Sequence, residues 1–221
     1  MEEWFVQTAI GRYTAAQEEQ FFTRYAPDRA GVVTAKMGGS WLRPSENVIG
    51  VPEDVRMEAE QMAWDTQSLD ALILPHTHEY AGWPDGVLAE AARVLKPEGC
   101  LLLTGFNPVS LWHLSRWFDG KRLPEKGRCR SVSQIRKQAA GLGLQIEYGQ
   151  FMAYVPPFDS AAAIRFWGFL EKAGDRWWPQ CAAVYGLVLV KRMAGVHPLS
   201  EFETELEGQA VVLGMAKMQG K

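Results

Sequence analysis

The chain has 221 residues, of which 47% are hydrophobic and 22% are charged, and its formal net charge at pH 7 is −3. These values are typical of one globular domain with a sizeable core, and the weak negative charge argues against a general binder of nucleic acid or membrane surfaces. No apolar run approaches the roughly 20 residues of a membrane span, and the acidic start MEEWFVQTAIGRY lacks the features of a signal peptide.

The three cysteines are Cys100, Cys129 and Cys181, and none belongs to a Cys-x-x-Cys pair. This odd, scattered set favours a reducing compartment over a disulfide framework. We therefore expect a cytoplasmic protein with one domain over residues 1–194 and a C-terminal tail over residues 195–221. The oligomeric state is left open.

The first part of the chain alternates helical and strand patterns. Apolar residues recur at helical spacing from Thr8 to Tyr25, and the stretch APDRAG ends this helix with proline and glycine. Short strands are expected at residues 32–35 and 48–51, and the first is followed by the pair Gly38-Gly39. The segment 56–70 has an ambiguous pattern.

The stretch EAARVLKPEGCLLLTG, residues 90–105, contains a helix end, a tight turn and a buried strand. Pro97 cannot continue a helix, and Gly99 permits the turn. The apolar run after it is typical of a strand buried on both faces. Together with a strand at residues 71–74 and a helix from Pro84 to Leu95, this is one repeat of a parallel α/β sheet.

The second half continues the alternation to a late pair of strands. Helical patterns are found at residues 107–118 and 164–173, and Ser131 is expected to cap another helix. Residues 144–154 and 183–192 have strand character. This order predicts a mostly parallel α/β sheet.

Residues 58–108 resemble the second half of the class I S-adenosylmethionine-dependent methyltransferase domain, of the type 11-like kind. The matching pieces are, in order, Glu58-Ala59, the strand Leu69–Leu74, the loop His76-Thr-His-Glu79-Tyr80 and the helix end VLKPEG. The segment Gly105–Trp112, GFNPVSLW, also resembles a bacterial branch of that family whose substrate is unnamed. The resemblance implies a Rossmann-like, doubly wound single domain with a seven-stranded, mostly parallel sheet, an antiparallel last strand, and methyl transfer from S-adenosylmethionine.

The same resemblance implies a cofactor site at the ends of the strands. Its residues would be Gly38, Gly39, Glu58, Ala59, Leu74 and Pro75. The first half departs from the family pattern, because Lys36 stands where an acidic residue is expected and would repel an ammonium group. The carboxylate expected to bind the ribose is missing at its place, since Glu53 and Asp54 come a few residues late.

Two interpretations of these departures stay open. One is a divergent, working methyltransferase that acts on an unknown acceptor. The other is a catalytically silent methyltransferase fold that serves as an interaction or regulatory protein. A nicotinamide dinucleotide enzyme is less favoured, because the Gly-x-Gly-x-x-Gly fingerprint is absent.

The segment from His76 to Glu79 is the first candidate for chemistry outside the cofactor site. His76 is the residue we expect to act as a general base, because a neutral imidazole titrates near working pH. A metal site at His76 and His78 is disfavoured. A structural or catalytic metal site needs three or four ligands, and further ligands beside this pair are not identifiable.

Three further residues, Asn107, Trp112 and Trp178, are expected to contact substrate, although Asn107 also suits a helix cap. The pair Trp177-Trp178 is hard to bury in full and is favoured as a substrate or partner contact. By contrast, the helical spacing of Phe166, Phe169 and Leu170 predicts core positions. The basic loop 119–130 is either a solvated loop or a site for phosphate, carboxylate or RNA, so nucleic acid is disfavoured as a partner without being excluded.

Overall fold

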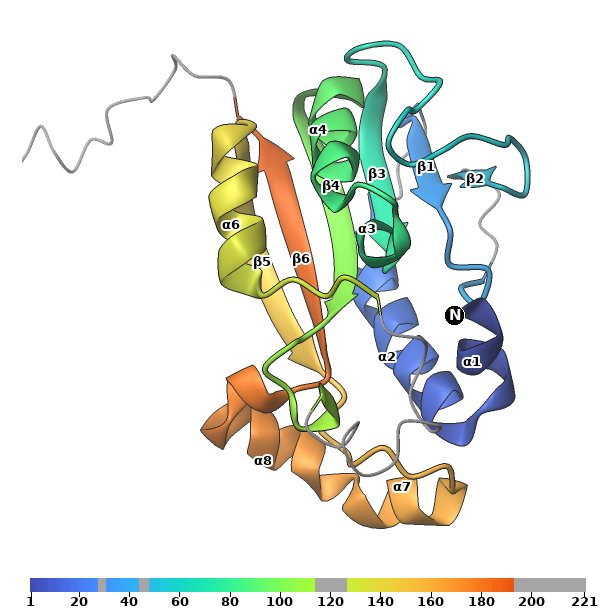
Figure 1. Ribbon diagram of the computed structural model, residues 1–221, viewed down its shortest axis with the longest axis vertical. Coiled ribbons are helices and arrows are strands. Elements are labelled where there is room, and N and C mark those ends of the chain that lie inside the picture. Colours follow the sequence, from blue (N-terminus) through green and yellow to red (C-terminus); the bar gives the residue numbers. More distant parts are fainter. Residues whose placement is uncertain (28–30, 44–47, 114–126, 193–221) are drawn as a thin grey trace, which may run out of the picture.

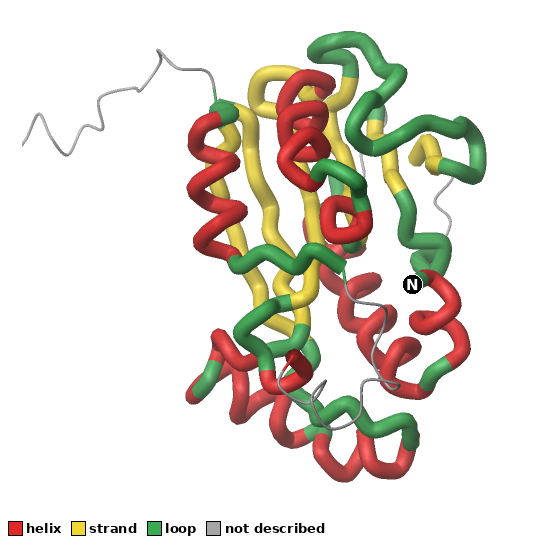
Figure 2. Tube along the Cα trace, in the orientation of Figure 1, coloured by secondary structure: helices red, strands yellow, loops and turns green. Residues whose placement is uncertain are grey.

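The computed structural model describes residues 1–27, 31–43, 48–113 and 127–192, which form a six-stranded sheet with helices on both faces (Figures 1 and 2). The strand order is β2-β1-β3-β4-β6-β5. Neighbouring strands among β1 to β4 pair in parallel, while β6 pairs antiparallel with both β4 and β5. The strands are β1 (Thr34–Met37), β2 (Val48–Val51), β3 (Leu69–Pro75), β4 (Leu95–Phe106), β5 (Leu144–Met152) and β6 (Val184–Lys191).

Two layers of helices cover this sheet. In Figure 1, α4 and α6 lie in front of the sheet and α2 lies behind it. The small helices α1 and α3 and the pair α7 and α8 lie toward the end at which the parallel strands finish. The helices are α1 (Glu2–Gln7), α2 (Ala9–Tyr25), α3 (Thr77–Tyr80), α4 (Pro84–Val94), α6 (Val132–Gly141), α7 (Ala161–Trp167) and α8 (Phe169–Trp177), with a 3-10 turn η2 (Pro179–Cys181).

The sequence explains the central strands and the helix ends. Strands β3 and β6, and β4 from Leu101 onward, are buried on both faces, which their continuous apolar runs predicted. The tight turn expected at Pro97 and Gly99 is wrong, because β4 begins at Leu95 and these residues form an irregularity in its pairing with β3.

Thr8 caps α2 by accepting a hydrogen bond from the Gly11 amide at 2.9 Å. Ser131 forms the predicted cap of α6, in a reciprocal capping box with Gln134. These side chains satisfy amide groups that a helix leaves free at its start.

The sheet has six strands in the described residues, whereas seven were expected. The connection between β2 and β3 comprises only residues 52–68, where we find an isolated bridge between Glu58 and Gln61 in place of a strand. A crossover between parallel strands needs a dozen residues or more, so this segment is too short to add a further strand with a helix on each side. The half of the sheet that precedes β3 is therefore abbreviated.

The predicted helix at residues 164–173 is two helices that meet at Gly168. The expectation that Phe166 and Phe169 belong to the core is wrong, because 71% and 59% of their surfaces are exposed. The buried side of this segment is formed by Ile164 and by Gly174, at which an added Cβ would lie only 2.2 Å from the Tyr154 ring. The break at Gly168 thus turns the two phenylalanines outward.

In the residues that the structure describes, no helix combines the length and the apolar character that crossing a membrane requires.

Candidate functional site

The carboxyl ends of β1 and β3 form the point at which the strand order reverses. From β1 the chain moves outward to β2, and it then returns to β3 on the other side of β1. Ligands of open α/β sheets bind beyond the strand ends at such a point. Helices α1 and α2 lie close to this end in Figure 1.

The loop after β1 packs directly on the end of β3. Gly38 and Gly39 have φ angles of +76° and +75°, which residues with a side chain rarely adopt. A Cβ atom on Gly39 would lie 2.5 Å from Cγ of Pro75. Thr77 reinforces this closure, since its hydroxyl donates a hydrogen bond to the Met37 carbonyl. The glycine at position 39 is therefore required by the close approach of two chain segments.

Lys36, which was expected to oppose a cationic ligand, has its charge engaged inside the protein. Its ammonium group donates to the Gly39 carbonyl at 3.3 Å and lies 3.6 Å from a carboxylate oxygen of Glu53. Glu53 follows β2 closely and reaches back to β1, so the carboxylate that the sequence places late is brought to the strand ends. The lysine and the glutamate neutralise each other at this edge.

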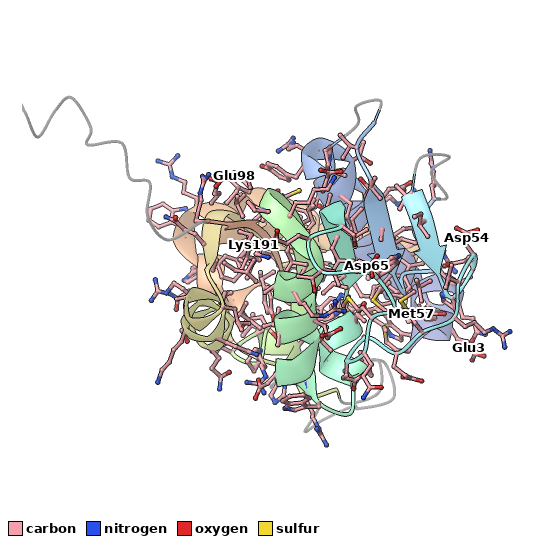
Figure 3. The ribbon with its side chains drawn as sticks, turned by 90° about the horizontal axis from the view of Figure 1, so that it is seen from above. Glu3, Asp54, Met57, Asp65, Glu98 and Lys191 are labelled. Carbon is pink, nitrogen blue, oxygen red and sulfur yellow. The ribbon has the colours of Figure 1, made fainter. Side chains whose placement is uncertain are left out.

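The remaining residues of the expected cofactor site are divided between surface and core. Glu58 and Ala59 lie in a turn between β2 and β3, where Glu58 is exposed and Ala59 is partly buried, and the Gln61 amide donates to the Glu58 carbonyl at 3.2 Å. Leu74 is fully buried in the main core, so its side chain supports the strand and does not line a site. Figure 3 shows Asp54 and Met57, from the same connection, on the β1–β2 side of the molecule.

A buried cluster of two glutamates and a histidine lies at the end of β3. His76 adopts a left-handed backbone conformation with φ of 53°, and its side chain is fully buried. Its Nε2 atom lies 2.6 Å from a carboxylate oxygen of Glu18 in α2, and its Nδ1 atom lies 2.8 Å from one of Glu79 in α3. We call Glu18, His76 and Glu79 the acid–histidine cluster.

The second oxygen of each glutamate is also satisfied. Glu18 accepts a hydrogen bond from the Trp41 indole at 3.0 Å, and Glu79 accepts one from the Phe106 amide at 2.5 Å. Sequence reasoning missed Glu18. The available signal was its position on the buried stripe of α2, four residues after Thr14 and three before Phe21.

The cluster keeps His76 charged. Burial alone would lower the pKa of His76, but the carboxylates of Glu18 and Glu79 outweigh it and raise this pKa to about 10. Burial raises the pKa of Glu79, against the opposing effect of His76. A base must be unprotonated and must reach its substrate. The role of His76 as general base thus stays a prediction, with the condition that the cluster opens and gives up a proton.

Aromatic rings seal the cluster from solvent. Phe5 of α1 stacks on Trp41 with 3.8 Å between ring centres and lies 5.4 Å from the His76 ring. The ring centres of Phe106 and His76 are 4.1 Å apart. Helix α1 therefore covers the end of β3, where it excludes water from the charged groups.

His78 is separate from the cluster. Its Nε2 atom lies 3.2 Å from the Tyr185 hydroxyl, and burial lowers the pKa of His78 to about 3. The two histidines thus contact different partners and differ in charge at neutral pH.

The expected substrate contacts are not brought together. Trp112 is buried and donates from its indole to the Val155 carbonyl at 2.7 Å. The Asn107 amide donates to the carbonyls of Gln180 and Ala182 at 2.6 and 3.1 Å, so it ties β4 to the segment before β6. Trp178 is 58% exposed, and Trp177 is exposed with it, as predicted. Most of the basic loop 119–130 lies outside the described residues.

We expect stability to fall as the pH rises from 6.5 toward 10. The pKa of His76 is raised by folding, so its contribution is fully present below about 6.5, the unfolded value, and is lost as the pH passes through about 10. The free energy of unfolding, measured by urea denaturation, should fall by up to about 1.4 kcal/mol per pH unit in this window. In the Glu18→Gln variant the free energy of unfolding should fall over a narrower pH range, because one of the two carboxylates that raise the pKa of His76 is removed. A wild-type profile that is flat between pH 6.5 and 9.5 would contradict the charged state of the cluster.

Comparison with known proteins gives one family and one fold. Residues 23–103 match a methyltransferase domain family. An uncharacterised protein of Escherichia coli strain K12, YafS, is 34% identical over 67 residues, which are 30% of this chain and 28% of that protein. The chain thus matches less than a third of the length of this relative.

Solved structures share the fold at low identity. An S-adenosylmethionine-dependent methyltransferase from Thermotoga maritima is 16% identical with a TM-score of 0.58, and the match covers 86% of this chain and 94% of that one. One from Archaeoglobus fulgidus is 15% identical with a TM-score of 0.55, covering 80% and 94%. The [4+2]-cyclase SpnF is also similar, with 15% identity, a TM-score of 0.55 and 83% coverage of both chains.

Proposed function

We propose that the chain is a class I methyltransferase, as the family match over residues 23–103 supports, and that it binds S-adenosylmethionine and transfers the methyl group to an acceptor at the carboxyl end of the sheet. One observation carries the proposal. A glycine pair in a left-handed conformation ends β1 at the switch point of the sheet and meets the end of β3. The fold alone would not suffice, because a cyclase shares it.

The described residues fit the adenosine end of the cofactor. Glu53 would accept hydrogen bonds from the ribose hydroxyls, since its side chain is 43% exposed and lies just beyond β2. Glu58 and Ala59 would contact the adenine from the turn before β3. Glu53 also pairs with Lys36 at 3.6 Å, so the charge of the lysine is balanced and does not oppose binding there.

The methionine end requires movement. Gly38 and Gly39 would hold it, but the contact of Gly39 with Pro75 and the hydrogen bond from Thr77 to Met37 now close the loop on the strand. S-adenosylmethionine supplies a methyl group on a positively charged sulfur. The side chains of Phe5 and Trp41 would exclude water during transfer, and His76 would hold a proton on each ring nitrogen unless the cluster opens.

The closed loop also favours a second candidate, a methyltransferase fold without activity. In that case the Lys36–Glu53 pair and the acid–histidine cluster would be purely structural replacements for cofactor contacts. The two candidates differ in ligand binding, which can be measured without knowing the acceptor.

The test is titration calorimetry with S-adenosylhomocysteine, the demethylated product. We expect micromolar binding that weakens by about 1–3 kcal/mol in Glu58→Ala and in Glu53→Gln, the usual cost of losing one polar partner. Asp65→Asn is the matched control, because Asp65 is an exposed carboxylate of the same connection. If folded protein gives no heat up to millimolar ligand, the inactive fold is the correct reading.

A further inference from the structure

Helices α7 and α8 carry exposed aromatic side chains at one end of the molecule. We call these the aromatic patch, and its members are Phe166, Phe169, Trp177 and Trp178, of which 71%, 59%, 68% and 58% of the surface is exposed. Figure 1 shows both helices lying across the end at which the parallel strands finish. A group of large apolar side chains left in water marks an interaction surface.

Two described arginines lie beside this patch. Arg165 is exposed beside Phe166, and the Arg176 guanidinium lies 6.0 Å from the centre of the Trp177 ring. Glu171 is turned inward instead, where it accepts a hydrogen bond from the Tyr154 amide at 2.8 Å. Among the side chains described on α7 and α8, the charges that face solvent are thus positive.

One aromatic residue and one arginine of α8 share a helix face. Phe169 and Arg176 stand seven residues apart in α8, a spacing that places them on the same face of a helix. An arginine beside a tryptophan can lay its aliphatic chain along apolar surface and keep its guanidinium group in the polar layer above it. The partner must therefore offer an apolar layer directly under an anionic one.

We propose that this end of the molecule binds the surface of an anionic lipid membrane, with the aromatic patch in the interface and Arg165 and Arg176 at the lipid phosphates. Tryptophan and phenylalanine favour the membrane interface, and anionic headgroups attract nearby arginines. Helices of seven and nine residues are too short to cross a bilayer, so the proposed contact is with its surface. The inference does not depend on methyl transfer.

Vesicle flotation of the full chain tests the proposal. We expect flotation with vesicles of phosphatidylcholine and phosphatidylglycerol, and at least tenfold weaker binding to phosphatidylcholine alone. The variant Phe166→Ser/Trp177→Ser should lose about tenfold or more in affinity. Trp83→Ser, which alters an exposed tryptophan outside α7 and α8, should bind like wild type.

The arginines have a matched control as well. Arg165→Gln/Arg176→Gln should lose about 25-fold in affinity, from roughly fivefold for each of the two basic residues near the surface. Arg24→Gln/Arg136→Gln removes two exposed charges from other helices and should keep its affinity.

Three results would overturn the proposal. They are no flotation of the wild type, equal flotation of the aromatic variant, or a dimer in gel filtration that the aromatic variant abolishes while vesicles bind neither protein. The last would assign the patch to a second copy of the chain. Unchanged circular dichroism melting of the variants is expected, since their side chains are exposed.

Discussion

Replacement of Glu18 with alanine is expected to lower the free energy of unfolding by about 3–5 kcal/mol, the usual effect of removing one partner from a buried ion pair. The His76 imidazole would lose its partner at 2.6 Å, and the Trp41 indole would lose its acceptor at 3.0 Å. Both groups would stay buried, because Phe5 and Phe106 still cover them. Urea denaturation monitored by circular dichroism measures the change.

The next residue in α2 supplies the control. Glu19 pairs with Arg43 at 2.9 Å, but the arginine side chain is 87% exposed, so Glu19→Ala should cost about 1 kcal/mol or less. Glu18→Gln should fall between the two, since it keeps hydrogen-bonding atoms and removes the charge. Equal effects of Glu18→Ala and Glu19→Ala would mean that the cluster contributes no more than a surface pair.

The size of this effect has a consequence for function. The cluster joins α2 to the end of β3, and through Trp41 it also holds the loop that follows β1. A ligand that opens the loop must disturb at least the Trp41 contact. Loss of Glu18 should therefore change ligand affinity as well as stability. Calorimetry with S-adenosylhomocysteine measures the affinity, and urea denaturation measures the stability.

The strands of the central sheet could be predicted because a strand buried on both faces has a continuous apolar run in its sequence. Strand β6 was expected at residues 183–192 and spans Val184–Lys191, and β2 was expected with the bounds that it has. Strand β1 was expected at residues 32–35 but spans Thr34–Met37, because Lys36 within it interrupts the apolar run. A charged residue in a strand is visible in sequence only as an interruption.

Local sequence patterns could not predict the number of strands or the acid–histidine cluster, because both depend on contacts between distant parts of the chain. The seventh strand was implied by resemblance, and the short connection between β2 and β3 has no room for it. His76 and Glu79 were singled out by sequence, whereas Glu18 lies 58 residues before His76 and reaches it through packing. The partner of Lys36 was missed for the same reason, because a bend after β2 returns Glu53 to β1.

Replacement of Gly39 with alanine is the second change with a large expected effect, about 2–5 kcal/mol in the free energy of unfolding. Part of the cost is the left-handed backbone, at about 1–2 kcal/mol for a residue with a Cβ atom. The rest is overpacking, about 1–3 kcal/mol, because the added carbon would lie 2.5 Å from Cγ of Pro75. The proline ring is tied to its own backbone and cannot turn away.

Gly38 separates these two contributions. Its φ angle of +76° is nearly the same as that of Gly39, but a Cβ atom there would come no closer than 3.4 Å to the Thr77 hydroxyl. Gly38→Ala should therefore cost only the backbone part, and the difference between the variants measures the contact with Pro75. If both lose the same stability, the loop is free of the strand end and already open to a ligand. If Gly39→Ala costs more, the glycine serves first to close the loop on β3, and the cofactor must displace that contact to bind.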